Sequence, residues 1–164
     1  IIYSNETKQK SKNNITEKIL SLELPNKHNI TFEDCLEHFQ IIENLDGDNK
    51  WFSEKHNKYV DAYKKLQIKC FAKYLIIHLK RFTYIDSSRK ISSEVSFKET
   101  VILKNQKFEL RGIIYHMGST GGGHYISAIK RDSWYSCNDE NISPINDINE
   151  IINNGYIYLY VKTK

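Results

Sequence analysis

The residues best suited to chemistry are a histidine and two polar residues that follow it along the chain. His124 comes directly after a run of glycines at 121–123, and fourteen residues later the chain offers Asn138 and Asp139. An amide or carboxylate oxygen that accepts a hydrogen bond from one ring nitrogen fixes the tautomer of a histidine and leaves its other nitrogen free as a base. The spacing therefore indicates two members of a Cys-His-Asn or Cys-His-Asp triad.

The elements that must position these residues are two neighbouring strands. Alternating apolar and polar residues predict one strand over 123–132 and another over 133–139, joined as a hairpin. We expect this hairpin to place His124 opposite Asn138 or Asp139, because directly opposed Cβ atoms of antiparallel strands are only about 5 Å apart. Adjacent residues of a strand point to opposite faces, so only one of the two can face the histidine directly.

The glycines before His124 need their own explanation, because four of the seven in the chain fall within six positions: Gly118, Gly121, Gly122 and Gly123. A phosphate-binding loop is not indicated, since neither GxGxxG nor GxxxxGK[ST] occurs and a strand follows in place of a helix. Two interpretations stay open. The glycines form a flexible hairpin turn, or they form a loop that lets another backbone pass close by, which residues without Cβ permit.

Composition bounds the class of protein. The 164 residues, 40% hydrophobic and 27% charged, are typical of one globular domain or a large piece of one. The start has neither an initiating Met nor a signal pattern, and we expect a fragment or a processed chain. We expect no membrane or nucleic-acid partner, because long apolar runs and Arg-rich stripes are absent. Three scattered cysteines, an odd number without CxxC spacing, predict a reducing compartment, cytoplasm or nucleus.

Hydrophobic periodicity predicts an α+β fold with an antiparallel sheet and short helices at its margins. A strand is expected to end before Pro25, and Thr31 with Asp34 three residues later is a weak capping signal for a helix. The remaining predictions are a helix over 30–47, strands over 58–70, 73–84, 107–118, 123–132, 133–139 and 155–162, a polar loop over 86–94 and a helix over 145–154.

Several stretches, in order, resemble the catalytic domain of the ubiquitin-specific proteases, which are papain-like cysteine peptidases. They are "LSLELP", "TFEDCLEHFQIIENLDGDNKWF", "LIIHLKRF", "GIIYHMGSTGGGHYISA", "WYSCNDENISPI" and "GYIYLYVK". Each motif alone is weak, but their order and spacing over roughly residues 15–162 are specific. The resemblance implies that residues 1–164 supply the palm and part of the fingers of a thumb–palm–fingers domain. The N-terminal half of that domain is then a partner that lies outside this chain.

The resemblance also implies roles for individual residues. His124 matches the general base, Asn138 the third triad position, and Asp139 a frequent second acid. Gly123 and Tyr125 match positions that flank the C-terminal tail of ubiquitin. The glycines would let this tail pass the base, so Gly121, Gly122 and Gly123 are expected to bind substrate, and ubiquitin and ubiquitinated proteins are the expected partners. Part of the polar loop 86–94 matches a loop that moves to admit the tail.

Two departures from the family pattern decide what we expect of this chain. The N-terminal cysteine box is absent. Cys35 matches a non-catalytic helix cysteine of the family and follows Asp34, whose charge would oppose a thiolate. Neither Cys70 nor Cys137 opens a helix whose N-terminus would lower a thiol pKa. We therefore expect the nucleophile outside the chain. The two CxxC pairs that often hold zinc read SNET at 4–7 and SEKH at 53–56, which leaves only His56 as a ligand. We expect no metal and no cofactor.

Two functions from different classes remain. The first is a working cysteine deubiquitinase to which this chain supplies the base and its partner. The second is a catalytically inactive relative that is kept as a ubiquitin-binding or scaffolding module. The presence of both His124 and Asn138 favours the first, because an inactive module has no chemical need for the pair. Tyr158 and Tyr160 could line the same surface, but an alternating aromatic strand is more often core.

Overall fold

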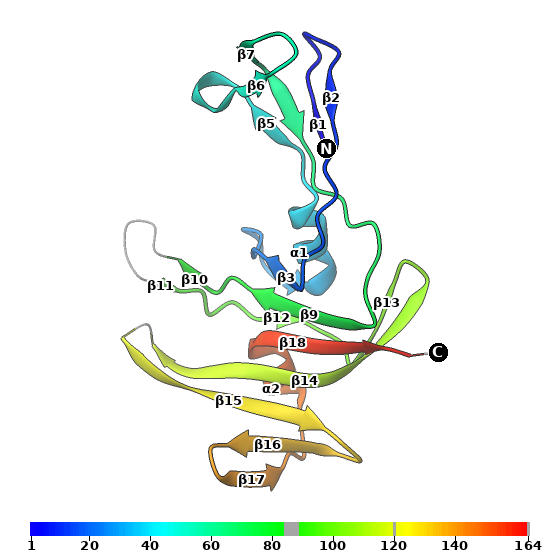
Figure 1. Ribbon diagram of the computed structural model, residues 1–164. Coiled ribbons are helices and arrows are strands. Elements are labelled where there is room, and N and C mark those ends of the chain that lie inside the picture. Colours follow the sequence, from blue (N-terminus) through cyan, green and yellow to red (C-terminus); the bar gives the residue numbers. More distant parts are fainter. Residues whose placement is uncertain (84–88, 120, 164) are drawn as a thin grey trace. The chain divides into compact units, whose positions relative to one another are not determined.

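The computed structural model describes residues 1–83, 89–119 and 121–163, and the chain divides into two compact units (Figure 1). Unit 1 comprises Ile1–Thr16 and Phe39–Lys69, and unit 2 comprises Glu17–His38 and Cys70–Lys164. Unit 2 contains His124 and both of its candidate partners. Within the described ranges, neither α-helix is long and apolar enough to span a membrane.

Unit 2 is built on an eight-stranded sheet, in which the order is β17-β16-β15-β14-β18-β9-β3 and β13 also pairs with β14. All neighbouring pairs are antiparallel except β3 with β9. The predicted α+β fold with a mainly antiparallel sheet is therefore confirmed. The strands are β3 (Ile19–Leu22), β9 (Tyr74–Leu79), β13 (Thr100–Leu103), β14 (Gln106–Ser119), β15 (Gly122–Lys130), β16 (Trp134–Asn138), β17 (Asn141–Pro144) and β18 (Gly155–Lys162).

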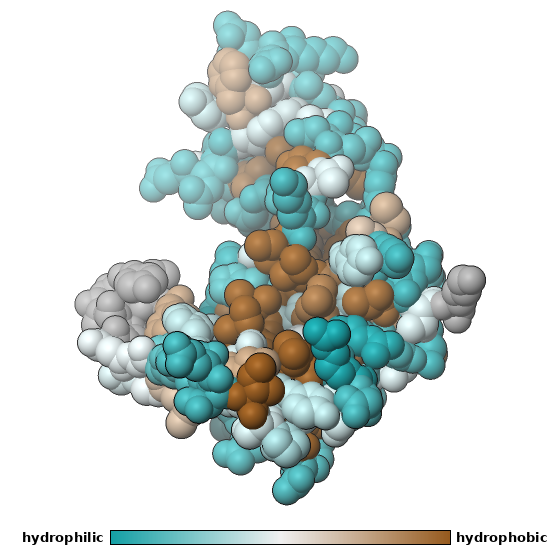
Figure 2. All heavy atoms as spheres, turned by 60° about the horizontal axis from the view of Figure 1, so that its bottom comes forward, coloured by the Kyte–Doolittle hydropathy of each residue, from teal (hydrophilic) through white to brown (hydrophobic). Residues whose placement is uncertain are grey.

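Aromatic side chains form the core on one face of this sheet. Tyr158 and Tyr160 of β18 are fully buried, and their hydroxyls donate to the carbonyl oxygens of Ile152 and Lys98. Phe97 stacks on Tyr158 with ring centroids 3.8 Å apart, and Phe32 of helix α1 (Phe32–Phe39) stacks on Phe97 at 4.9 Å. Both phenols thus belong to the core, as the alternating pattern of 155–162 suggested. Figure 2 shows apolar side chains gathered in the middle of the face turned toward the viewer, with hydrophilic ones around them.

Helix α1 begins with reciprocal hydrogen bonds between Thr31 and Asp34. The Asp34 backbone N–H donates to Thr31 Oγ1 at 3.1 Å, and the Thr31 N–H donates to Asp34 Oδ2 at 2.8 Å. The predicted helix over 30–47 is nevertheless too long, because the structure ends it at Phe39. Ile41 and Ile42, which follow the helix, are mostly exposed, and the chain then forms strand β5 (Glu43–Leu45).

Unit 1 consists of short strands, and its sheet has the order β2-β1-β8-β5 with β6 and β7 as a separate pair. The prediction of one strand over 58–70 is wrong. Its residues split between β7 and β8 because β7 pairs with β6, whereas β8 pairs with β1 and β5. The elements are β1 (Ile2–Tyr3), β2 (Lys10–Ser11), β5 (Glu43–Leu45), η1 (Gly47–Asn49), β6 (Trp51–Ser53), β7 (Lys58–Val60) and β8 (Ala62–Lys64).

Short elements complete unit 2. β4 (Ile30–Thr31) pairs in parallel with β12 (Val95–Ser96), β10 (Phe82–Thr83) pairs with β11 (Arg89–Lys90), and α2 spans Asn149–Asn154. The predicted polar loop 86–94 thus contains a short strand, and its residues 86–88 lie outside the described residues. The predicted strand over 73–84 is interrupted between β9 and β10, and the predicted helix over 145–154 begins only at Asn149. The predicted strand over 155–162 coincides with β18.

Candidate active site

The candidate site lies where β15 begins and β16 ends. His124, on β15, places Nε2 at 2.6 Å from Oδ1 of Asn138, the last residue of β16. The same Nε2 lies 3.6 Å from Oδ2 of Asp139, whose side chain is 75% exposed. The structure therefore brings together all three residues that the sequence selected, and Nδ1 is the ring nitrogen that neither oxygen contacts.

The contact between His124 and Asn138 is diagonal, which differs from the predicted direct opposition. The paired residues of β15 and β16 run from Lys130↔Trp134 to Ser127↔Cys137, so the same register would put Ile126 opposite Asn138. Diagonal neighbours on antiparallel strands lie about 7–8 Å apart but remain within reach of long side chains. A histidine and an asparagine are long enough to close that distance.

The expectation that Asp139 must point away from His124 is wrong. Asp139 is not a strand residue: it follows β16 in the turn toward β17 and has φ +51. Aspartate is one of the few residues that tolerate this left-handed conformation. The turn breaks the alternation of the strand, and the carboxylate consequently reaches the same ring nitrogen as the Asn138 amide. Asn138 is still the nearer of the two acceptors.

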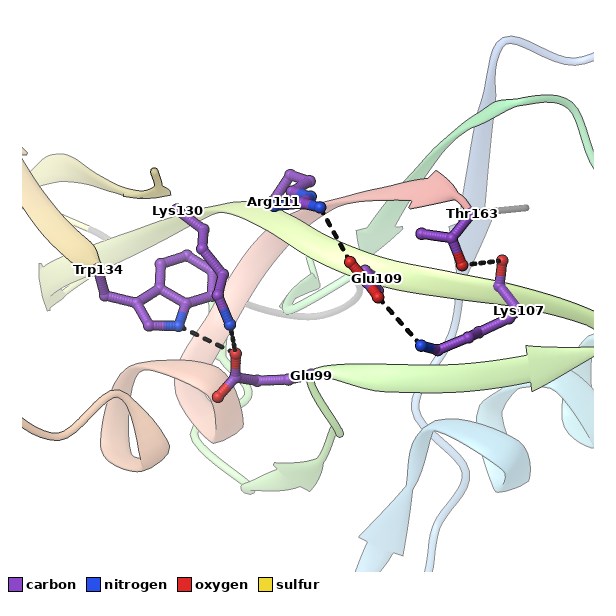
Figure 3. A network of polar contacts seen from close by, with 7 residues as sticks. All are labelled: Glu99, Lys107, Glu109, Arg111, Lys130, Trp134 and Thr163. Carbon is purple, nitrogen blue, oxygen red and sulfur yellow. Dashed lines mark hydrogen bonds and ion pairs between the residues drawn. The ribbon is translucent and has the colours of Figure 1, made fainter. Parts of the chain in front are cut away.

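The other end of the β15–β16 hairpin is fixed by Glu99, which precedes β13 (Figure 3). Its carboxylate accepts a short hydrogen bond from Lys130 Nζ and one of 3.2 Å from Trp134 Nε1. Lys130 and Trp134 are cross-strand partners. The Lys130 ammonium and the Trp134 indole hold the pKa of Glu99 below its usual value, in spite of the opposing effect of burial. This polar contact ties the turn end of the β15–β16 hairpin to the segment that precedes β13.

The glycines before His124 differ in their surroundings. A Cβ on Gly123 would lie 2.2 Å from His116 Nε2 and 2.5 Å from the Met117 carbonyl oxygen, so no side chain fits there. Gly118 has φ +109, which L residues rarely adopt. Gly121 and Gly122, in contrast, have no atom within 4 Å of their Cβ positions. Close approach within the chain explains Gly118 and Gly123, and only Gly121 and Gly122 border open space.

Four aromatic rings pack together next to the glycine hairpin, and of these the sequence assigned a role to Tyr125 alone. The His116 ring packs on Tyr125 with centroids 4.7 Å apart, on Phe82 at 5.6 Å and on Tyr156 at 5.8 Å. Tyr125 itself remains 55% exposed. Burial, and secondarily the ammonium of Lys90, lower the pKa of His116, which favours the neutral ring. His116 stands opposite Tyr125 in the ladder, which is the signal that could have found it.

The three cysteines lie in different surroundings, and none occupies the first position of a helix. Cys35 is fully buried in α1, and burial, with the neighbouring Asp34 charge, raises the pKa of its thiol to about 11. Cys70 is exposed and lies outside any helix or strand, and Cys137 pairs with Ser127 inside the sheet. A reactive cysteine needs a lowered pKa, which helix N-termini or nearby cations provide.

The residues that the resemblance matched to zinc ligands lie in two turns joined by hydrogen bonds. The Ser4 hydroxyl donates to the Asp61 carbonyl oxygen at 2.8 Å, and the Ser53 hydroxyl donates to Gln9 Oε1 at 2.5 Å. The Ser4 N–H also donates to the Gln9 carbonyl oxygen at 3.0 Å. Both serines are fully buried. Structural zinc takes four ligands from cysteine, histidine and carboxylates, so these residues with His56 do not fit the metal.

The fold resembles that of solved deubiquitinase modules. A chain of the SAGA DUB module that contains Ubp8, Sgf11, Sus1 and Sgf73 and is bound to monoubiquitin aligns with a TM-score of 0.82 at 28% identity. A chain of the same module bound to ubiquitin aldehyde aligns with a TM-score of 0.80 at 27% identity. The alignments cover 99% of this chain and 39–40% of those chains. The papain-like α+β class predicted from the sequence is thereby confirmed.

Residues 2–160 match the family described as ubiquitin carboxyl-terminal hydrolase, and the chain belongs to this family. Ubiquitin carboxyl-terminal hydrolase Usp2 of Drosophila melanogaster is 33% identical over 88% of this chain and 17% of its own length. Ubiquitin carboxyl-terminal hydrolase 4 of Arabidopsis thaliana is 30% identical over 89% of this chain and 44% of its own. The chain therefore spans less than half the length of these relatives.

Proposed function

We propose that this chain is part of a thiol-dependent deubiquitinase that hydrolyses peptide and isopeptide bonds after the C-terminal glycine of ubiquitin, with His124 as its base. The observation that carries this proposal is the 2.6 Å contact between His124 Nε2 and Asn138 Oδ1. Membership of the ubiquitin carboxyl-terminal hydrolase family supports the reaction, and the ubiquitin-bound neighbours support the substrate.

In the proposed reaction, the Asn138 amide oxygen accepts from the Nε2–H of neutral His124, which leaves Nδ1 unprotonated. Nδ1 takes the proton of a cysteine thiol, and the thiolate attacks the carbonyl carbon of the terminal glycine. The imidazolium then donates this proton to the departing lysine amine, and a thioester remains. His124 next deprotonates a water molecule that hydrolyses the thioester, and the regenerated thiol closes the cycle.

The two acceptors act differently on the imidazolium. The Asn138 oxygen carries no net charge and accepts a short hydrogen bond, so it fixes the orientation and the tautomer of the His124 ring. The Asp139 carboxylate lies farther away and carries a full charge, so it attracts the imidazolium electrostatically once that has formed. Because Asp139 is largely exposed, solvent weakens its contribution.

The proposal places the nucleophilic cysteine in the N-terminal half of the catalytic domain, outside these residues. Unit 2 then serves as the palm and unit 1 as part of the fingers. Gly121, Gly122 and the exposed Tyr125 are proposed to flank the C-terminal tail of ubiquitin, since open space surrounds the first two. Gly123 also flanks the tail, through its backbone.

The test uses the protein that contains this chain and ubiquitin that carries a thiol-reactive group at its C-terminus. The expected result is a covalent adduct, formed at least about 100-fold more slowly by a His124→Ala variant with an unchanged far-ultraviolet spectrum. Ubiquitin binding without any adduct would contradict the proposal and indicate a binding or scaffolding module.

A further inference from the structure

Strand β14 extends beyond its neighbour β18, and this leaves part of its outer edge without a strand. The pairs between the two strands end at Tyr115↔Gly155, whereas β14 continues to Ser119 and pairs there with β15 alone in the described chain. Strand edges carry unpaired N–H and C=O groups, and such groups are costly when they are partly buried. This edge belongs to the hairpin that carries His124.

The ammonium of Lys90 occupies the edge that β18 does not reach. Lys90 Nζ donates to the carbonyl oxygens of His116 at 3.1 Å and Gly118 at 3.0 Å, and it lies 3.4 Å from His116 Nδ1. A lysine ammonium has three N–H donors, which matches these three acceptors. The two carbonyls flank Met117, and Met117 is the cross-strand partner of His124.

Lys90 reaches the hairpin from a well-anchored segment. The next residue, Ile91, donates its N–H to the Arg81 carbonyl oxygen at 2.7 Å and accepts from the Arg81 guanidinium at 3.4 Å. Arg81 is 2% exposed and also donates to the carbonyl oxygens of Ser93 at 2.5 Å and Gly155 at 2.9 Å. The backbone beside Lys90 is therefore fixed to the first residue of β18 through a buried side chain.

The contacts around Lys90 lead directly to the base. The His116 ring, which Lys90 contacts, fills the space that a side chain on Gly123 would need. Gly123 is bonded to His124 and pairs with Gly118. A displacement of His116 or Gly118 would consequently move the backbone that aims the His124 ring at Asn138.

We propose that Lys90 is a positioning residue for His124: its ammonium replaces the missing strand at the outer edge of β14 and holds the glycine hairpin in the conformation that joins His124 to Asn138. Lys90 acts through the backbone of β14. The kinetic readout of this proposal rests on the proposed function, whereas its structural readout does not.

The test compares Lys90→Met, which keeps the aliphatic stem and removes the donors, with Lys107→Met as a matched control. Lys107 also lies in unit 2, where Nζ pairs with the Glu109 carboxylate on the exposed side of β14 (Figure 3). In the protein that contains this chain, Lys90→Met is expected to lower kcat for a ubiquitin–fluorophore substrate about 10-fold or more, with KM changed less than about 2-fold. Nitrogen-15 spectra of the His124 ring should lose the single Nε2–H tautomer, whereas Lys107→Met should leave kcat and the spectrum unchanged.

The conservative variant Lys90→Arg separates positioning from general stability. Its guanidinium also donates to carbonyl oxygens, so we expect it to restore the His124 tautomer and most of kcat. If Lys90→Met does not fold, Lys90→Arg becomes the test. The proposal then requires that the nitrogen-15 spectrum of the His124 ring in Lys90→Arg equals that of the unmodified protein. Equal kcat and equal His124 spectra for Lys90→Met and Lys107→Met would overturn the proposal. Absence of turnover in the unmodified protein would contradict the proposed function, and the spectra would still decide the role of Lys90.

Discussion

At the scale of single residues, His124 has two oxygen acceptors that differ in charge and distance. Asn138 contacts Nε2 at 2.6 Å, and the Asp139 carboxylate lies 3.6 Å from the same atom. In the proposed reaction the two adjacent residues have different tasks: the Asn138 amide orients the ring, and the Asp139 carboxylate attracts the imidazolium. Replacing one of the two acceptors at a time therefore separates their effects.

Replacement of the orienting amide should be more damaging than replacement of the carboxylate. We expect Asn138→Ala to lower kcat/KM by about 100-fold or more, and Asn138→Asp to be tolerated because it retains an acceptor oxygen. Asp139→Ala should have a smaller effect, and His124→Ala the largest. Steady-state hydrolysis of a ubiquitin–fluorophore substrate measures all four. If Asp139→Ala were far worse than Asn138→Ala, the carboxylate would be the orienting group.

The glycines allow a second comparison. The Cβ position of Gly123 is occupied by neighbouring atoms, whereas that of Gly122 is open. Gly123→Ala puts a methyl group against the His116 ring and the Met117 carbonyl, and we expect it to lower the free energy of unfolding by about 1–3 kcal/mol. Gly122→Ala meets nothing within 4 Å and should leave the free energy of unfolding nearly unchanged. If the ubiquitin tail passes Gly122, this second variant should still raise KM. Denaturant unfolding and steady-state kinetics check both, and equal stability losses would contradict the packing around Gly123.

At the scale of elements, the N-terminus of α1 should respond to acid. Hydrogen bonds from Lys27 and from the Thr31 hydroxyl and backbone lower the pKa of Asp34 to about 2 from an ordinary value of 3.8. A lowered pKa stabilises the fold above pH 3.8, and this contribution disappears as the pH falls through about 2. We expect the denaturant midpoint of the unmodified protein to fall over this interval more steeply than that of Asp34→Asn. Parallel curves would contradict a native role for the ionised carboxylate.

The paired turns of unit 1 should hold together without metal. Gln9 joins them, because its backbone oxygen accepts from Ser4 and its side chain accepts from the buried Ser53 hydroxyl. Gln9→Ala leaves Ser53 without this partner, and we expect a loss of about 1–3 kcal/mol in the free energy of unfolding of unit 1. A metal chelator should leave the unmodified protein unchanged, and elemental analysis should find well under one zinc per chain. Chelator-induced unfolding would contradict this account.

Some elements could be predicted from the sequence because their signal is local. The alternation of Tyr156, Tyr158 and Tyr160 defines β18, and the Thr31–Asp34 spacing defines the start of α1. The end of α1 could not be predicted, because the apolar residues Ile41 and Ile42 follow the helix and their exposure is not visible in the sequence. Within the site, the three polar residues were found, but the conformation of Asp139 is set by a turn that strand alternation does not encode.

The contacts of Lys90 were missed for a different reason. They join residues 26 and 28 positions apart in the chain, and they depend on where β18 stops pairing with β14. No local pattern specifies that length difference between two strands. The contact between the His116 ring and Gly123 could not be predicted from a local pattern either. Packing against this ring accounts for Gly123, whereas Gly121 and Gly122 border open space.

At the scale of the whole molecule, the chain holds the proposed base and its two acceptors, and none of its three cysteines lies at the first position of a helix. Burial raises the pKa of Cys35 to about 11, and the other two cysteines lie outside any helix. The chain also spans only 17% and 44% of two relatives in its family. Our account therefore assigns the nucleophile to the N-terminal half of the catalytic domain, and its central claim is that His124 serves that cysteine.

The most direct test is hydrolysis of ubiquitin joined to a lysine side chain through an isopeptide bond. The protein that contains this chain, together with its proposed nucleophile, should release free ubiquitin. His124→Ala should reduce kcat/KM by about 100-fold or more while ubiquitin binding is retained, because only the proton transfers are lost. Unchanged hydrolysis by His124→Ala would contradict the account, as would unmodified protein that binds ubiquitin and never releases it from the conjugate.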